Sequence, residues 1–183
     1  QPGPARTTYS SVRPAYQLAA WLDLVVLVAA EPAVPWRSVG VHKHGTKAEA
    51  VVVDLELTAP PGDASSRRQV ALDALEVAVD CYRRGSVEPL PLFPLVSFDL
   101  ANGANATGNW VRHQGGGDGT SAATRLVYGE RDLRDLRSIA RQEHDPLTHS
   151  GPDADRPLCY AEYLWGAVAE SARNRAEAAE VAS

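Results

Sequence analysis

The longest apolar pattern in the sequence predicts a helix near the start of the chain. Apolar side chains recur at three- and four-residue spacing from residue 14 to residue 30, as they do on one face of an α-helix. Pro14 suits the first turn, where a backbone N–H has no partner within the helix, and Glu31-Pro32 ends the pattern. Val26 and Val28 widen the apolar face, so we expect this helix to be buried on most of its sides.

A second helix is predicted for residues 66–84, after the break at Pro60-Pro61-Gly62. Ser66 and Gln69 have the spacing of a capping box, and Gly85 is a typical residue after the last turn of a helix. The expected apolar face consists of Val70, Leu72, Leu75, Val79 and Tyr82.

Three segments in the first part of the chain have the composition of β-strands. Residues 7–12 lie between two prolines, residues 36–42 alternate loosely between apolar and polar side chains, and residues 50–57 are rich in valine. Gly45 lies at the expected turn between the second and the third segment. The pattern therefore predicts short strands around the first helix.

The rest of the chain alternates between loops and shorter helical patterns. Residues 89–94 contain three prolines, which favour an extended segment, and the apolar residues between them need a groove to lie in. Residues 115–119 form a glycine-rich loop. Asp132 is expected to cap a short helix that continues through Gln142, and Pro157 is expected to begin the last helix.

Composition and charge exclude several classes of protein. The 183 residues carry a formal net charge of −5, whereas free-standing nucleic-acid-binding proteins are usually basic. The most apolar run is shorter than the roughly 20 residues that span a bilayer, so no membrane association is expected. Methionine is absent even at position 1, and we interpret the chain as a processed product or a piece of a longer protein.

The two cysteines bear on the cellular compartment. Cys81 and Cys159 each lie in an apolar, helix-like context, which is typical of thiols that are buried as small apolar side chains. They lie far apart, outside any metal-binding or redox motif. We therefore expect a cytoplasmic protein, and a disulfide between these cysteines stays open without being required.

Asp54 and Glu56 are the strongest candidates for catalytic chemistry. They share one face of the valine-rich segment, and paired carboxylates can hold Mg²⁺ for phosphodiester hydrolysis. The lysine that nucleases usually carry two residues later is Thr58 here, and a solvated strand face explains the alternation equally well. His42 and His44 also share a strand face, but no third metal ligand follows at a recognisable spacing.

Several short segments carry a resemblance to a known family by their order and spacing. The most specific is Pro89-Leu90-Pro91-Leu92-Phe93-Pro94; the others are residues 9–14, 18–22 and 35–37, Trp110, and residues 129–132 and 163–165. Together they resemble the C-terminal region of RecC, the gamma subunit of exodeoxyribonuclease V, in its actinobacterial form. The resemblance extends over nearly the whole chain.

The resemblance implies an α/β fold with a degenerate PD-(D/E)XK nuclease-like core, a small mixed sheet flanked by helices, and a helical C-terminal part. In active relatives a strand carries Asp-Tyr-Lys, and a following helix carries Gln-x-x-x-Tyr. Here Thr8-Tyr9-Ser10 stands at the first motif, and Gln17 with Trp21 resembles the second. Thr8 then replaces the metal-binding carboxylate and Ser10 replaces the lysine, so the implied state is a nuclease fold without catalytic residues.

The leading hypothesis is one RecC C-terminal domain over residues 1–183, truncated at its N-terminal side. Residues 1–85 would form a core of sheet and helices, and residues 86–183 the proline-rich segment, loops and C-terminal helices. The domain would be a structural and DNA-guiding part of a RecBCD-type ATP-dependent helicase–nuclease that acts in double-strand break repair. Its implied partners are the RecB and RecD subunits, which would use ATP and Mg²⁺, with DNA bound in the assembled complex and no cofactor in this chain.

Two alternatives stay open. The chain could be an active Mg²⁺-dependent nuclease that uses Asp54 and Glu56, or an unrelated α/β protein-interaction domain. Arg137 and Arg141, four residues apart on one predicted helix, are candidates for a surface near DNA, although solvated helix charges explain them equally well.

Overall fold

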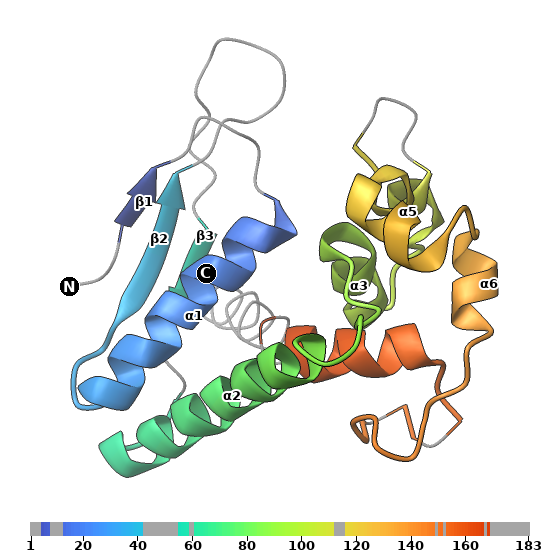
Figure 1. Cartoon of the computed structure of the whole chain (residues 1–183). Helices are drawn as coiled ribbons and strands as arrows, with labels where there is room; N and C mark the ends of the chain where they lie inside the picture. Colours follow the sequence, from blue (N-terminus) through green and yellow to red (C-terminus); the bar gives the residue numbers. More distant parts are fainter. Residues whose placement is uncertain are drawn as a thin grey trace, which may run out of the picture. The chain divides into compact units, whose positions relative to one another are not determined.

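The computed structural model consists of helices joined by loops, with short strands in the first part of the chain (Figure 1). Contacts between Cα atoms divide the chain into two units, with a boundary between Val79 and Asp80. The residues that the structure describes are 5–7, 13–41, 55–58, 61–111, 116–148, 150–151, 153–166 and 168.

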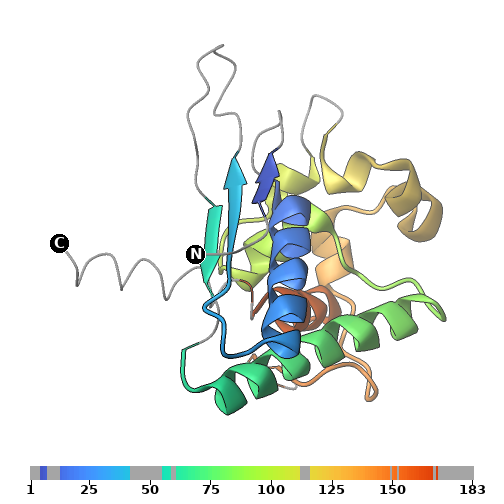
Figure 2. The ribbon, with the colours of Figure 1, turned by 90° about the vertical axis from the view of Figure 1, so that its left-hand side faces the viewer.

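The first unit contains a small mixed sheet and a helix that packs on it. Strands β1 (Ala5–Thr7), β2 (Arg37–Val41) and β3 (Leu55–Thr58) lie in the order β1-β2-β3. Strand β1 runs parallel to β2, and β3 runs antiparallel to it. Helix α1 (Pro14–Ala30) packs against β2 and β3 and lies along the sheet in Figures 1 and 2.

Helix α1 confirms the predicted N-terminal helix. Pro14 occupies its first turn, and at its end the backbone N–H of Glu31 donates to the carbonyl oxygen of Leu27. The fully buried residues form one stripe and most of the others are half-buried, but Val26, which was expected to widen the buried face, is 51% exposed. The buried residues are Ala20, Trp21, Leu24, Val25 and Val28.

Helix α2 (Ala64–Gly85) confirms the second predicted helix but buries a different face. The Oδ1 atom of Asp63 accepts a hydrogen bond of 2.8 Å from the N–H of Ser66, so Asp63 takes the capping role predicted for Ser66. The buried side chains are small ones, Ala71, Ala74 and Cys81, whereas Val70, Leu72, Val79 and Tyr82 of the predicted face are exposed. The prediction of the buried face was wrong because it weighed apolar size and ignored how closely small side chains let a helix pack.

Helices and loops build the core of the second unit. The aromatic ring of Phe93 meets Trp110 edge to face with 5.1 Å between centroids and Tyr128 with 5.5 Å. The buried members of this core are Phe93, Val96, Leu100, Ala106, Trp110, Leu133, Leu136 and Ala161. The elements after α2 are α3 (Pro94–Ala101), α4 (Thr107–Trp110), the 3-10 helix η1 (Asp118–Thr120), α5 (Ala122–Tyr128), α6 (Leu133–Arg137) and a last helix described over residues 156–166.

The proline-rich segment leads directly into this core. Pro91 and Phe93 are buried, as predicted for apolar residues that need a groove, but Pro94 begins helix α3 and does not extend the segment. The first turn of α3 is capped by Asp118, whose Oδ2 accepts hydrogen bonds of 2.9 and 2.8 Å from the N–H groups of Leu95 and Val96. A residue distant in the sequence thus closes the end of this helix.

The expectation of an α/β fold with a nuclease-like sheet core is wrong. The described residues are mostly helical, and the three strands have only three, five and four residues. The hydrophobic core of the second unit is formed by helices and loops, among them α3 and α4, which were not predicted from the sequence. No helix in the described ranges combines the length and apolarity needed to cross a membrane.

Candidate functional site

The residues that the sequence singled out for metal or nuclease chemistry are mostly outside the described ranges. Glu56 lies in β3, where its backbone is opposite Val39 of β2. The carboxylate pair of Asp54 and Glu56 and the degenerate motif at Thr8 and Ser10 therefore stay predictions. Of these candidate residues, five lie outside the described ranges: Thr8, Ser10, His42, His44 and Asp54.

The two cysteines are buried, as expected, and both are free thiols, which answers the question of a disulfide that the sequence left open. Burial raises the pKa of Cys81 to about 11 and also raises the pKa of Cys159. Both thiols are therefore protonated at neutral pH, and neither is an activated nucleophile.

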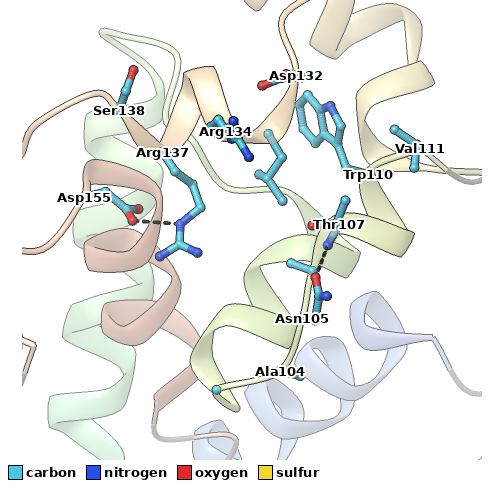
Figure 3. Close-up of a pocket in the computed structure, with 13 residues that line it drawn as sticks. Ala104, Asn105, Thr107, Trp110, Val111, Asp132, Arg134, Arg137, Ser138 and Asp155 are labelled. Atoms are coloured by element: carbon cyan, nitrogen blue, oxygen red, sulfur yellow. Dashed lines mark hydrogen bonds and ion pairs between the residues drawn. The ribbon is translucent and has the colours of Figure 1, made fainter.

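An open groove of about 1030 Å³ lies beside α6 in the second unit (Figure 3). Its walls come from the turn between α3 and α4, from α4 itself, from α6 and from Asp155. Its volume is at the upper end of the roughly 300–1,000 Å³ that ligand pockets usually have. We call it the α6 groove.

The turn between α3 and α4 forms one wall of the α6 groove. Gly103 has a φ of +68°, which glycine adopts without strain, so the chain can turn sharply after α3. The Oδ1 atom of Asn105 accepts a hydrogen bond of 3.0 Å from the N–H of Thr107, the first residue of α4. In Figure 3, Asn105 and Thr107 lie across the groove from Arg137.

Trp110 and Leu133 give the α6 groove an apolar floor, and both belong to the buried core. Gly119 packs against the indole ring of Trp110, since a Cβ at position 119 would lie 2.5 Å from Trp110 Cε2. Any larger residue at position 119 would therefore displace the indole or the loop. The floor depends on this close contact.

Helix α6 places two arginines at the α6 groove. The Oδ1 atom of Asp132 accepts a hydrogen bond of 2.8 Å from the N–H of Asp135 and caps the helix, as the sequence predicted. Leu133 and Leu136 point into the core, which leaves Arg134 and Arg137 exposed.

Arg137 is the more constrained of these two arginines. Its Nε donates to Asp155 Oδ2 at 2.8 Å, and its side chain is 44% exposed. Among the described residues, the guanidinium of Arg134 has no carboxylate within ion-pair distance. The groove therefore presents one arginine with a partner and one without.

Arg137 and Arg141 do not share a helix face. Helix α6 ends at Arg137 and does not continue through Gln142. Arg141 donates from Nη1 to the carbonyl oxygens of Gln142 at 3.1 Å and Asp145 at 3.0 Å, so it holds a loop. The predicted pair is wrong, and Arg134 with Arg137 is the pair that lines one surface.

The α6 groove has the chemistry of a binding surface. Its described lining contains no histidine, cysteine, glutamate or lysine, and its two carboxylates bond backbone N–H groups and Arg137, with no hydrogen bond to a hydroxyl of the lining, so no nucleophile is paired with a base there. The hydroxyl of Ser138 donates to the carbonyl oxygen of Asp135 at 2.6 Å and so caps a carbonyl near the end of α6. Binding through guanidinium groups and apolar contact is what this arrangement supports.

A second set of polar side chains in this unit is largely buried, and its members bond one another. We call it the Asp145 cluster; its members are Glu88, His144, Asp145, Arg156 and Tyr160. Arg156 donates from Nε to the two oxygens of Asp145 at 3.1 and 2.9 Å and from Nη2 to Glu88 Oε1 at 2.7 Å. The hydroxyl of Tyr160 donates to Asp145 Oδ1 at 2.9 Å. The Asp145 side chain is 0% exposed and that of Arg156 is 11% exposed.

The protonation states in the Asp145 cluster follow from these bonds. Burial alone would raise the pKa of Asp145, but hydrogen bonds from the Gln142 N–H, Tyr160 and Arg156 outweigh burial and hold this pKa below its usual range. Burial and the bond to Asp145 raise the pKa of Tyr160 to about 12. At neutral pH, Asp145 is therefore ionised and Tyr160 is protonated.

The Asp145 cluster is an ion-pair network and does not suit a metal ion. Ligand atoms of Glu88, His144 and Asp145 lie within 4.8 Å of one another. However, the guanidinium of Arg156 already bonds both carboxylates and supplies the positive charge that a metal ion would bring. We assign this cluster a structural role.

The sequence signals for these two groups differ in strength. Arg134 and Arg137 could have been recognised, because they lie three residues apart behind the cap Asp132. Glu88, Asp145 and Arg156 are far apart in the sequence, and no local pattern connects them. Only the fold brings them together.

These features define a mainly helical domain with an open binding groove and no assembled catalytic set among the residues that the structure describes. The family model of the RecC C-terminal domain matches residues 2–105, more than half of the chain, and the chain therefore belongs to this family. The match confirms the resemblance over residues 2–105, a range that contains its most specific segment at residues 89–94, whereas the resembling segments from Trp110 onward lie after the matched range. No curated protein and no solved structure matches the chain.

Family membership has two consequences. It indicates that the chain is part of a RecBCD-type multisubunit complex. It also contradicts the alternative that the chain is an unrelated protein-interaction domain. The match ends at residue 105, whereas most residues of the α6 groove follow that position. The role of the groove therefore has to be argued from its own chemistry.

Proposed function

We propose that the chain is a non-catalytic structural domain of a RecBCD-type ATP-dependent helicase–nuclease and that it helps to guide DNA in double-strand break repair by homologous recombination. The observation that carries this proposal is the family match over residues 2–105. Partner subunits of the RecB and RecD type would supply ATP hydrolysis, Mg²⁺ binding and strand cleavage, and the complex would work in the cytoplasm.

The described residues support a role without catalysis. Burial keeps both cysteines protonated, and Arg156 already neutralises the buried carboxylate Asp145. A net charge of −5 favours contacts with other subunits over independent binding to DNA. The chain would then meet DNA only within the assembled complex.

Co-expression tests the structural role. The full chain, joined to its natural N-terminal sequence where one exists, is expressed with RecB- and RecD-type subunits and purified through a tag on one partner. We expect the chain to co-purify in a fixed stoichiometry. Its absence from the purified complex would contradict the structural role.

A nuclease assay tests the absence of catalysis and the alternative of an active nuclease. Purified chain is incubated with linear DNA and Mg²⁺, alongside Asp54→Ala and Glu56→Gln variants. We expect no cleavage by any of the three proteins, because cleavage would belong to the partner subunit. Cleavage by the unmodified chain that disappears in the Asp54→Ala variant would establish the alternative.

The DNA-guiding role needs a separate test in the assembled complex. Forked DNA that carries photoreactive bromodeoxyuridine near the fork is bound to the complex and irradiated. We expect cross-links to this chain. If cross-links form only to the other subunits, the guiding role is wrong while the structural role stands.

A further inference from the structure

We propose that the α6 groove is a docking site for a partner protein segment that places a carboxylate beside an apolar side chain. The inference rests on the proposed function, because a multisubunit complex supplies the partner chain. It goes further by naming the surface and the chemistry of its occupant.

The charges at the α6 groove favour one added carboxylate. Asp132 is engaged by the N–H of Asp135 at 2.8 Å, and Asp155 accepts from the N–H of Leu158 at 2.9 Å and from Arg137 at 2.8 Å. Both carboxylates are thus occupied by the fold, whereas Arg134 has no carboxylate partner among the described residues.

Arg137 has further capacity on the same surface. A guanidinium carries five N–H donors, and Asp155 takes only the one on Nε. Within the described part of the chain, no hydrogen bond from either Nη of Arg137 is formed. Two guanidinium groups three residues apart can therefore receive a carboxylate through charge-assisted hydrogen bonds.

The remaining walls suit an apolar side chain. Trp110 and Leu133 form the floor, and Val111 at the end of α4 is 47% exposed. Thr107 and Asn105 supply polar groups opposite Arg137 (Figure 3). An extended peptide can thus bury an apolar side chain against the floor while its acidic neighbour reaches the arginines.

The same charges favour a peptide over a nucleic-acid strand. A strand brings one phosphate per nucleotide, and its phosphates on either side of the arginines would lie near the exposed carboxylates of Asp132 and Asp135. A peptide can place one carboxylate at the arginines and uncharged groups on either side, which limits that repulsion. The occupant is therefore a protein segment.

Binding of the full chain to an array of octapeptides tests this inference without the complex. The peptides combine Leu, Val or Phe with Asp or Glu, and each is printed beside its counterpart with Asn or Gln. The full chain is applied at physiological ionic strength as wild type, as Arg134→Gln and as Arg125→Gln. Arg125 is an exposed arginine on α5 outside the groove and provides the matched control.

We expect acidic peptides to bind the wild type at least tenfold more tightly than their amide counterparts. This preference should fall about tenfold in Arg134→Gln, in line with one lost charge-assisted contact, and persist in Arg125→Gln. An equal affinity for acidic and amide peptides would overturn the proposal, as would an undiminished preference in Arg134→Gln.

A competition arm separates a protein partner from nucleic acid. A 20-nucleotide oligo(dT) is added to the bound acidic peptides, and we expect no displacement at a concentration equal to that of the peptide. Displacement that depends on Arg134 would overturn the proposal in favour of a nucleic-acid site. Co-purification with partner subunits is measured in a separate experiment without peptides. A failure of the proposed function can therefore be distinguished from a failure of this inference.

Discussion

Two arginine sites in the second unit show how the same side chain takes different roles. Arg156 is 11% exposed and bonds two carboxylates in the Asp145 cluster, one of which is fully buried. Arg134 is exposed at the α6 groove and has no carboxylate partner among the described residues. Burial of opposite charges commits Arg156 to the fold, whereas exposure leaves Arg134 available for a ligand.

Replacing Arg156 should have the largest effect. The Arg156→Met variant keeps much of the volume of the side chain but leaves the carboxylate of Asp145 buried without a cation. We expect a loss of about 3–5 kcal/mol in the free energy of unfolding, as for other buried ion pairs from which one partner is removed. Urea denaturation of the full chain followed by circular dichroism measures this change.

Arg134→Met is the matched control for that experiment. An exposed residue without an ion-pair partner should change the unfolding free energy by no more than about 0.5 kcal/mol. Equal losses in the two variants would contradict the assignment of Arg156 to the fold and Arg134 to the surface.

Gly119→Ala tests whether the floor of the α6 groove is as tightly built as the Asp145 cluster. The added Cβ would lie 2.5 Å from Trp110 Cε2, and we expect a loss of about 1–3 kcal/mol from overpacking. Thermal unfolding measures the change. Gly108→Ala in α4 is the control, because a Cβ there has no neighbour within 4 Å and alanine favours a helix. If both variants unfold at the same temperature, the contact between Gly119 and Trp110 is not tight.

The parts of the fold that the sequence predicted are those that local residues mark. Helix α1 was predicted because Pro14 and a regular apolar spacing mark it locally, and the cap of α6 was predicted from Asp132. The buried face of α2 was missed because Ala71 and Ala74 are small, and apolar size alone did not reveal them.

The candidate sites depend on residues that are far apart in the sequence, more than the helices do. The Asp145 cluster joins Glu88 to Arg156, and the cap of α3 comes from Asp118, so neither follows from a local pattern. The nuclease-like fold was inferred from a family resemblance, and this family membership proved right while the sheet core did not. Family membership therefore did not determine the local architecture.

The pH dependence of stability should separate two carboxylates that both accept backbone hydrogen bonds. The pKa of Asp145 is lowered in the folded state, so its contribution to stability is present above about pH 4 and is lost as the pH falls below that value. Burial raises the pKa of Asp118 despite hydrogen bonds from Val96 and Leu95. Its ionised form therefore costs stability at neutral pH, and this cost disappears as the pH falls through the raised pKa.

Asp145→Asn and Asp118→Asn test these opposite signs through unfolding free energies from pH 7 down to pH 3. Asp145→Asn should be less stable than the wild type at pH 7, and the difference should shrink below about pH 4. Asp118→Asn keeps an oxygen that can accept from α3, so it should be at least as stable as the wild type at pH 7. A less stable Asp118→Asn variant at pH 7 would contradict the cost assigned to ionised Asp118, and an Asp145→Asn variant as stable as the wild type would contradict the role given to Arg156.

Arg137→Gln should have a small effect on stability, between those of the Arg156 and Arg134 variants, because Arg137 is exposed but has an ion-pair partner. Its ion pair with Asp155 joins a side chain that is 44% exposed to one that is 14% exposed. Solvent screening then limits the expected loss to about 0.2–1 kcal/mol, and 1 M NaCl should reduce it further. Arg134→Gln is the control, because it removes an arginine of the same helix without removing an ion pair. Urea denaturation of both variants at low and high salt therefore isolates the contribution of the ion pair to the free energy of unfolding. A salt-independent loss above about 2 kcal/mol would place Arg137 with Arg156 in the fold and leave Arg134 as the arginine that serves the groove.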